Sequence, residues 1–347
     1  MKQKAIFPAI MAAICYSISA PIAKLLLQEI SPVFLAALLY LGAGIGMTGV
    51  KALKRNKQKE ANLTKADTPY VIAMIVLDIA APIFLMMGLL RTTAATVALI
   101  GNFEIVVTAL IALFVFKEAI GARMWLAIIL ITIACGILSI ADYGNITITG
   151  GIIYILLACT CWGLENNCTK MLSLSDPLQI VIIKGWGSGL GSLGLAFWLR
   201  EVSINMSYVL AALAVGFVAY GLSIYFYIHA QRRIGAARTS AYYAFAPFIG
   251  TAISFAVFRE QMRIEFVLGL LVMMVGSYFA VSENHQHYHQ HEFADHNHRH
   301  SHSDGHHTHY HAKDEVDATK EHSHQHVHQQ GEHSHQHLPD MHHNHSH

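Results

Sequence analysis

The amino-acid sequence predicts an all-α integral membrane protein of ten transmembrane helices, arranged as two inverted five-helix repeats and followed by a disordered His-rich tail. The first observation is composition: 54% of the 347 residues are hydrophobic and only 13% are charged, which is far from the average for soluble proteins. The second is an internal repeat. The third is histidine content, since 23 of the 24 histidines follow residue 283.

The apolar segments have the length of membrane spans. A helix needs roughly 20 apolar residues to cross the hydrocarbon core of a bilayer. Short links join ten such segments, which are centred near residues 16, 41, 79, 105, 131, 160, 188, 217, 247 and 272. We therefore expect one helical bundle with the lipid bilayer as its solvent.

The repeat is visible when the apolar segments are placed in register. Phe116-Lys117-Glu118 then aligns with Phe258-Arg259-Glu260, and residues 91–95 align with residues 233–237. Each copy holds five apolar segments, and because five is odd, the second copy crosses the membrane in the opposite sense from the first. We predict a first repeat over residues 5–141, a second over residues 150–282 and the tail over residues 283–347.

The basic residues predict the orientation of the chain. Lys and Arg favour the cytoplasmic side of short loops. Placing the N-terminus in the cytoplasm puts most of them there, including the cluster from Lys51 to Lys65. Ten crossings return the tail to the same side. We expect a multi-pass protein of the cell membrane with both termini in the cytoplasm.

Particular residues of the two copies match a known family. The second copy contains Trp162-Gly163, Lys170, Pro177, Lys184 and Ala246-Pro247-Phe248. In the first copy Lys24 and Pro32 match Lys170 and Pro177, whereas Tyr16-Ser17 replaces Trp162-Gly163, Leu39 replaces Lys184, and Glu104-Ile105 stands where the family often has Glu-Pro. Over residues 5–282 the chain resembles the EamA-type proteins of the drug/metabolite transporter superfamily. The resemblance implies transport of an organic metabolite.

Ionisable residues within predicted spans are costly unless they face a cavity or a partner, so they are candidate functional groups. They are Asp78, Glu104, Glu165, Lys184 and His229. Asp78 and Glu104 are candidates for proton coupling or solute contact, and a structural ion pair, for example of Glu104 with Lys184, is the alternative. Trp162 and Asn166 flank Glu165 and are candidates for solute contact.

Cys161, Glu165 and Cys168 are spaced i, i+4, i+7 and therefore share one face of a helix. Two sulfurs and a carboxylate suit a soft or borderline metal ion such as zinc. The favoured alternative is a glutamate that lines a metabolite cavity beside incidental cysteines. Glycines in the second and seventh segments, such as Gly44 and Gly185, predict close helix contacts.

The tail alternates histidine with polar residues and has almost nothing apolar to bury, so we predict that it is disordered. Neutral imidazoles on such a chain can bind zinc, nickel, cobalt or copper. The clearest runs are His296, His298, His300 and His302, followed by His322, His324, His326 and His328.

These features favour a secondary transporter that carries a small organic metabolite by alternating access. Coupling of this transport to protons is a hypothesis that rests on the acidic residues within the spans. One alternative is a divalent transition-metal transporter with the tail as buffer or sensor, and another is a membrane-anchored metal sensor or store without transport. The sequence has no phosphate-binding glycine loop, nucleophile elbow or soluble catalytic domain, so we expect neither an enzyme nor an ATP-driven pump. No cofactor and no nucleic-acid partner is required.

Overall fold

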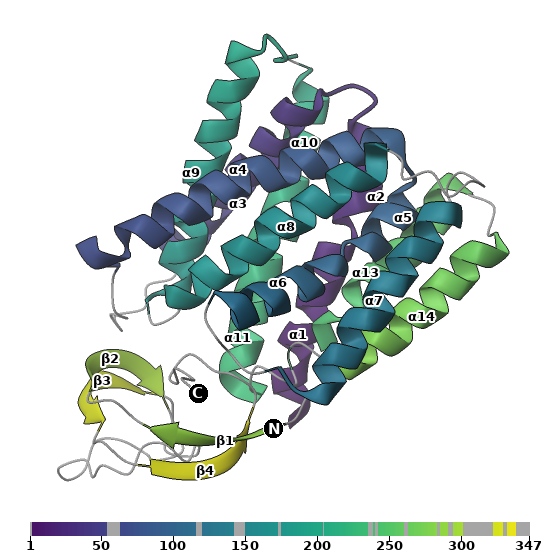
Figure 1. Cartoon of the computed structure of the whole chain (residues 1–347). Coiled ribbons are helices and arrows are strands. Elements are labelled where there is room, and N and C mark those ends of the chain that lie inside the picture. Colours follow the sequence, from purple (N-terminus) through teal and green to yellow (C-terminus); the bar gives the residue numbers. More distant parts are fainter. Residues whose placement is uncertain are drawn as a thin grey trace.

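A computed structural model describes residues 2–53, 63–115, 120–141, 150–172, 175–203, 205–234, 239, 242–259 and 263–282, together with the backbone of four short strands in the tail. Outside the tail the described chain is helical, and its helices pack side by side in one bundle (Figure 1). This confirms the predicted fold class.

The elements follow the order of the predicted spans. In the first copy they are α1 (Lys2–Ser17), α2 (Ser19–Leu26), α3 (Pro32–Leu53), the short 3-10 helix η1 (Lys65–Asp67), α4 (Thr68–Arg91), α5 (Ala94–Ile100), α6 (Phe103–Phe114) and α7 (Ala122–Ala141). In the second copy they are α8 (Gly150–Met171), α9 (Pro177–Trp198), α10 (Met206–Gly216), the π-helix η2 (Phe217–Leu222), α11 (Ser223–Ile234), α13 (Ala246–Phe258) and α14 (Ile264–Val281).

Length and composition make eight of the described helical segments able to cross a membrane. Helices α8 and α13 complete the ten predicted segments. Helix α8 has 22 residues but includes Glu165, Asn166 and Asn167, and α13 is apolar but has only 13 described residues. Large apolar side chains remain exposed on the outside of the bundle, among them Phe114, Trp198, Leu210, Leu271 and Tyr278. Such a surface is suited to lipid.

The two copies pack on each other reciprocally. Helix α8 contacts α4 and α6, and its counterpart α1 contacts α11 and α13, which are the counterparts of α4 and α6. The same relation holds for single residues: a Cβ atom at Gly163 would lie 3.0 Å from the backbone N of Thr108, and one at Gly250 would lie 2.9 Å from the backbone O of Ser17. Gly163 aligns with Ser17, and Gly250 aligns with Thr108. The two contacts are therefore equivalent under the internal repeat.

Helices α3 and α9 cross at glycines, as predicted for small residues in membrane helix contacts. A Cβ at Gly185 would lie 2.5 Å from the backbone N of Gly44, and one at Gly189 would lie 2.7 Å from the backbone N of Leu41. Only residues without a Cβ allow the backbones to approach this closely. Gly194 has no such role, because nothing described lies within 4 Å of a Cβ placed there.

Three spans are irregular where they pass the centre of the bundle. The fourth span breaks at Gly101 and Asn102, between α5 and α6, and a turn at Ala244 and Phe245 precedes α13 at nearly the matching position of the second copy. The eighth span contains η2, which places Tyr220 in the buried interior. Irregular backbone at membrane depth is tolerated where protein or a polar cavity surrounds it, and π-helical turns are frequent at functional sites.

The tail has four described strands: β1 (His285–Gln290), β2 (Ala294–His300), β3 (His322–His328) and β4 (Glu332–His337). Strand β1 pairs antiparallel with β4, and β2 with β3, where the backbones of His296, His298 and His300 oppose those of His326, His324 and His322. Most of the tail lies outside the described residues, so the disorder that the sequence predicts there stays a prediction. His302 lies outside the described residues.

We predict that Gly185→Ala lowers the stability of the protein by about 1–3 kcal/mol, because the added methyl group meets the backbone of α3 rather than a movable side chain. Thermal unfolding of the purified protein measures the effect. Gly194→Ala, in the same helix with open space around it, is the matched control and should unfold like the unmodified protein. Equal loss in both variants would contradict a tight crossing at Gly185.

Candidate functional site

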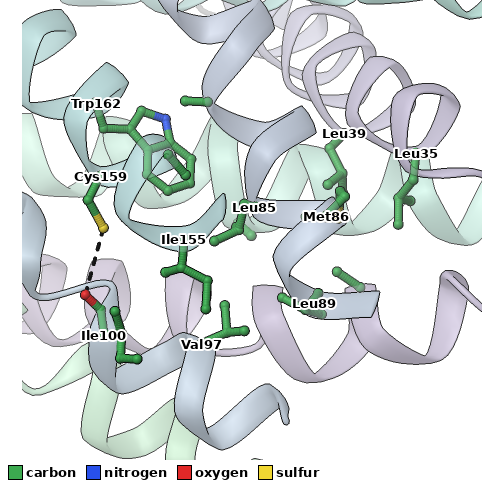
Figure 2. Close-up of a cluster of buried hydrophobic side chains, with 14 of the residues drawn as sticks. Leu35, Leu39, Leu85, Met86, Leu89, Val97, Ile100, Ile155, Cys159 and Trp162 are labelled. Carbon is green, nitrogen blue, oxygen red and sulfur yellow. Dashed lines mark hydrogen bonds between the residues drawn. The ribbon is translucent and has the colours of Figure 1, made fainter. Parts of the chain in front are cut away.

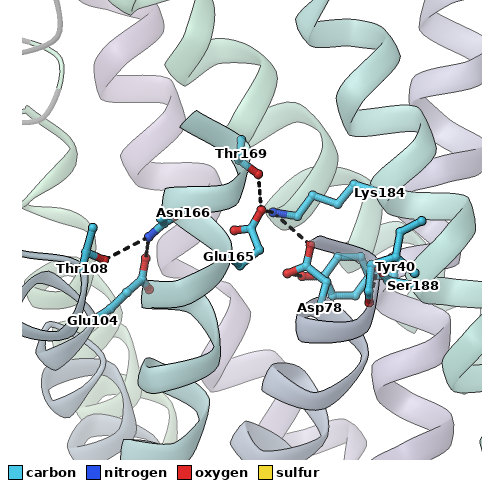
Figure 3. Close-up of polar contacts among 10 residues, drawn as sticks. Tyr40, Asp78, Glu104, Thr108, Glu165, Asn166, Thr169, Lys184 and Ser188 are labelled. Atoms are coloured by element: carbon cyan, nitrogen blue, oxygen red, sulfur yellow. Dashed lines mark hydrogen bonds and ion pairs between the residues drawn. The ribbon is translucent and has the colours of Figure 1, made fainter. Parts of the chain in front are cut away.

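Lys184 is placed by the start of α9. The Asp176 side chain accepts a hydrogen bond from the backbone N–H of Leu178 at 2.9 Å, and Pro177 is the first helical residue, so the helix begins at a fixed point. Two turns later Lys184 Nζ lies 3.1 Å from Asp78 Oδ2 and 3.0 Å from Glu165 Oε1 (Figure 3). One ammonium group therefore pairs with carboxylates from α4 and α8.

Two hydroxyl groups complete this arrangement, which we call the Lys184 cluster: Lys184, Asp78, Glu165, Tyr40 and Thr169. Tyr40 donates its phenolic hydrogen to Asp78 Oδ1 at 2.8 Å, and Thr169 donates to Glu165 Oε1. The side chains of Asp78, Glu165 and Lys184 are 0%, 2% and 13% exposed. These three charges are thus paired with one another, as the cost of burying them requires.

Glu104 lies apart from this cluster, in the first turn of α6 just after the Gly101-Asn102 break. Its Oε1 accepts a hydrogen bond from Asn166 Nδ2 at 2.6 Å, and the same amide lies 3.4 Å from Thr108 Oγ1. The alternative of a Glu104–Lys184 ion pair is therefore wrong. Lys184 bonds to Asp78 and Glu165, and Glu104 has a neutral partner.

Helix α8 separates the two groups of polar side chains. Glu165 and Asn166 are consecutive, and consecutive helical residues point about 100° apart. Figure 3 shows Glu165 directed to Lys184 and Asn166 directed to Glu104. Of the three described carboxylates in this region, Asp78 and Glu165 pair with the ammonium group of Lys184, and Glu104 does not.

A row of tyrosines leads away from the Lys184 cluster. The ring centroids of Tyr40 and Tyr220 are 5.4 Å apart, those of Tyr220 and Tyr16 are 6.4 Å apart, and those of Tyr16 and Tyr243 are 5.7 Å apart. Tyr227 continues the row at 5.0 Å from Tyr243. We call these five residues the tyrosine row. They come from α3, η2, α1, the helical residues just before the turn at Ala244, and α11, so aromatic rings from both copies meet at the centre.

Two predicted site residues lie elsewhere. Trp162 is buried in the apolar cluster with Leu85, Val97 and Ile155, beside the thiol of Cys159 (Figure 2). His229 lies on α11, where its ring stacks on Tyr225 with centroids 6.0 Å apart. Trp162 therefore packs the core instead of joining the Lys184 cluster, because the face of α8 that bears it meets apolar side chains of α4 and α5.

The structure does not bring Cys161, Glu165 and Cys168 together as a group that could hold a metal ion. Glu165 is engaged by Lys184 and Thr169. Within the described part of the chain, no three His, Cys, Asp or Glu side chains gather closely enough to hold a metal ion. Helical spacing places the three residues on one stripe, but the stripe is broad and the carboxylate turns toward the ammonium group.

Sequence reasoning missed Tyr40, Thr169 and Thr108. Thr169 follows Glu165 by four residues, and helical side chains at this spacing can meet. The sequence could therefore have predicted the contact between Thr169 and Glu165. Tyr40 stands in an apolar run and gave no sign that its hydroxyl reaches Asp78. Thr108 likewise follows Glu104 by four residues.

The structure describes some of the residues that the two copies have in common. Lys24 donates to the backbone oxygens of Leu89 and Thr92, the latter at 2.8 Å, and so stabilises the carboxyl end of α4. Arg259 adopts a left-handed backbone conformation (φ 50°) that ends α13. Residues 116–118, Glu260 and the side chain of Lys170 lie outside the described residues.

The architecture and the buried charges together define a class of protein. Two five-span copies related by reciprocal packing, broken spans at the centre, and an asymmetric polar interior are characteristic of membrane transporters with inverted repeats. Within this class the chain belongs to the EamA-like transporter family, whose model matches residues 3–140 and 149–282. This places it in the drug/metabolite transporter superfamily.

Individual relatives agree with the family. A protein of Methanothermobacter thermautotrophicus named an uncharacterized transporter is 28% identical over 287 residues, which cover 77% of this chain and 83% of the relative. The uncharacterized transporter YyaM of Bacillus subtilis is 24% identical over 232 residues, which cover 63% and 74% of the two chains. A solved crystal structure with 15% identity covers 80% of this chain and 96% of its own, with a TM-score of 0.58, and shows the likeness of fold.

We predict that Lys184→Met destabilises the protein by about 3–5 kcal/mol, because it leaves two buried carboxylates without their ammonium partner. Thermal unfolding measures the loss. Neutralising the carboxylates as well, with Asp78→Asn and Glu165→Gln, should restore much of the stability. If the triple variant were no more stable than Lys184→Met, the lysine would act through packing and not through its charge.

Proposed function

We propose that this protein is a secondary transporter that moves a small organic metabolite across the cell membrane by alternating access, and that it does not catalyse a covalent reaction. Two observations carry the proposal. The Lys184 cluster and the hydrogen bond between Glu104 and Asn166 lie where the two copies meet. The chain also belongs to a transporter family. Buried ionisable groups at this depth are expensive and normally serve a solute or ion pathway.

The packing of the two copies supports alternating access. The crossing of α3 and α9 at small residues allows one helix to rock on the other without displacing large side chains. The breaks in the fourth and ninth spans provide places where backbone angles change with little loss of regular hydrogen bonding. Reciprocal packing gives each copy an equivalent surface on which to move.

The excess of carboxylates supports coupling to protons. Asp78 and Glu165 share Lys184, whereas Glu104 has an amide partner only. A carboxylate that has no compensating cation in a low-dielectric interior gains most from binding a proton. We therefore place proton coupling at Glu104 in preference to Asp78, the other acid that the sequence suggests.

We predict that Glu104→Gln abolishes proton-linked solute flux in proteoliposomes. Glutamine keeps the hydrogen-bonding capacity toward Asn166 but cannot take up and release a proton. A pH-sensitive dye inside the vesicles, with mixtures of amino acids and of amines added outside, measures the flux. Glu29→Gln, an exposed residue, is the control for loss of a carboxylate. Unchanged flux in Glu104→Gln would remove this residue from the coupling mechanism.

We also propose that the tail lies in the cytoplasm and binds zinc, nickel, cobalt or copper ions. The support is the density of histidines after residue 283 and the excess of basic residues on the side assigned to the cytoplasm. Tail-bound metal would be a store or signal beside the transport path.

We predict that inside-out membrane vesicles bind zinc through the tail and that right-side-out vesicles do not. Zinc uptake from the medium at low concentration measures the binding, with a variant ending at residue 284 as the control. Binding in neither vesicle type would contradict a metal-binding tail. Tail-dependent binding in right-side-out vesicles alone would reverse the orientation.

A further inference from the structure

The strands of the tail form two antiparallel pairs that share one register. We call β1 and β2 the first arm, and β3 and β4 the second arm. Figure 1 shows β1 beside β4 and β2 beside β3, and in both pairs the numbers of opposing residues add to the same value. The second arm therefore returns along the first with no net slip between one pair of strands and the next.

Histidine lies opposite histidine throughout this register. The pairs are His285 with His337, His287 with His335, His289 with His333, His296 with His326, His298 with His324 and His300 with His322. Every histidine in β1 and β2 has such a partner, and in β3 and β4 only His328 lies opposite another residue, Ala294. Residues two apart lie on the same face of a strand, so the backbone register places the three pairs of each ribbon on one face.

The alternation of histidine changes phase in both arms at matching places. Histidine occupies odd-numbered positions in β1 and even-numbered positions in β2, and it occupies even-numbered positions in β3 and odd-numbered positions in β4. A slip of one residue would place each of these histidines opposite a different kind of residue. A tail that required only many histidines would have no need for both arms to change phase together, so the two arms are complementary in sequence.

Strand pairing of this kind needs a further stabilising interaction. An isolated two-stranded ribbon is marginally stable at best in water, and protonated imidazoles directly opposite each other repel. A transition-metal ion changes both conditions. It binds neutral imidazole rings, and its binding energy adds to the stability of the fold that presents them.

The spacing of a ribbon suits such an ion. Opposing residues on one face have Cβ atoms about 4.5–5.5 Å apart, and the next pair on that face lies about 7 Å further along the strands. Zinc binds imidazole nitrogens at about 2.0–2.1 Å and takes four ligands in a tetrahedron. One histidine pair supplies two of these ligands, and the neighbouring pair supplies the other two.

We infer that zinc, or another transition-metal ion that imidazole binds, bridges the opposing histidines of the two arms and holds the arms together as a paired ribbon. The inference rests on the proposed metal binding by the tail and names the ligands and the structural effect. The ligands are the six histidine pairs of the register. A metal-loaded tail then differs in structure from a metal-free tail, which is what a metal-dependent signal at this end of the chain requires.

Exchanges of neighbouring residues test the inference without changing the composition of the tail. The β3-exchange variant swaps His322 with Ser323, His324 with Gln325 and His326 with Val327. Strand β3 then has the same phase as β4, so a slip that pairs the histidines of β2 and β3 separates those of β1 and β4.

A second variant restores the pairing. The β2–β3-exchange variant adds the mirror exchanges in the first arm, which are His296 with Asp295, His298 with Asn297 and His300 with Arg299. Each moved histidine of β2 is then opposite a moved histidine of β3 in the original register. The two variants and the unmodified protein contain the same number of histidines.

Backbone hydrogen exchange of the full-length protein in lipid nanodiscs, with zinc or with a chelator, measures the pairing. In the unmodified protein we expect zinc to slow exchange in all four strands by about 10-fold or more, because paired strands protect their N–H groups. In the β3-exchange variant zinc should protect β1 and β4 but not β2 and β3. In the β2–β3-exchange variant protection of β2 and β3 should return.

Zinc retained by the same samples separates this inference from the proposed metal binding, with the variant ending at residue 284 as the reference. If the tail retains zinc but zinc protects none of the strands, the bridging of the arms is overturned and metal binding by the tail stands. Equal protection of β2 and β3 in the β3-exchange variant, or no recovery in the β2–β3-exchange variant, would also overturn it. If the unmodified protein retains no more zinc than the reference, both proposals fail.

Discussion

The ion pair of Lys184 with Asp78 and Glu165 is the interaction on which the interior of this protein depends. It joins α4 of the first copy to α8 and α9 of the second, and Tyr40 of α3 extends it by a hydrogen bond. Each of these charges would be strongly unfavourable alone in a lipid-embedded bundle, so the three must be close together whenever they are buried. That condition fixes how the copies meet at the centre.

Around this interaction the scaffold is nearly symmetric and the polar lining is not. Close helix contacts occur twice, once in each copy, such as Gly163 with Thr108 and Gly250 with Ser17. The reason is that aligned residues of both copies are small where helices cross. The charged groups have no such mates: Asp78 aligns with Tyr220 and Lys184 with Leu39. The two copies therefore share their packing contacts, whereas the charged side chains of the interior differ between them.

Sequence reasoning succeeded for features that depend on local composition and failed where partners had to be chosen. It identified the spans, the repeat, the glycine crossing and the residues with charge at membrane depth. It did not identify Tyr40 as the partner of Asp78, and it named Trp162 as a candidate for solute contact, whereas this ring lies in the apolar cluster that includes Leu85 and Ile155. The cysteine stripe of α8 had the right period for a metal site, but the period says nothing about where Glu165 turns.

The sequence by itself determined that the chain is a membrane bundle of two opposed copies, because apolar length, an odd number of segments per copy and the placement of basic residues are properties of the chain alone. Only the tertiary structure decided which charges neutralise one another. Three carboxylates and one ammonium group on α4, α6, α8 and α9 could pair in several ways. In the structure Lys184 Nζ lies within 3.1 Å of carboxylate oxygens of Asp78 and Glu165. Glu104 instead accepts a hydrogen bond from Asn166.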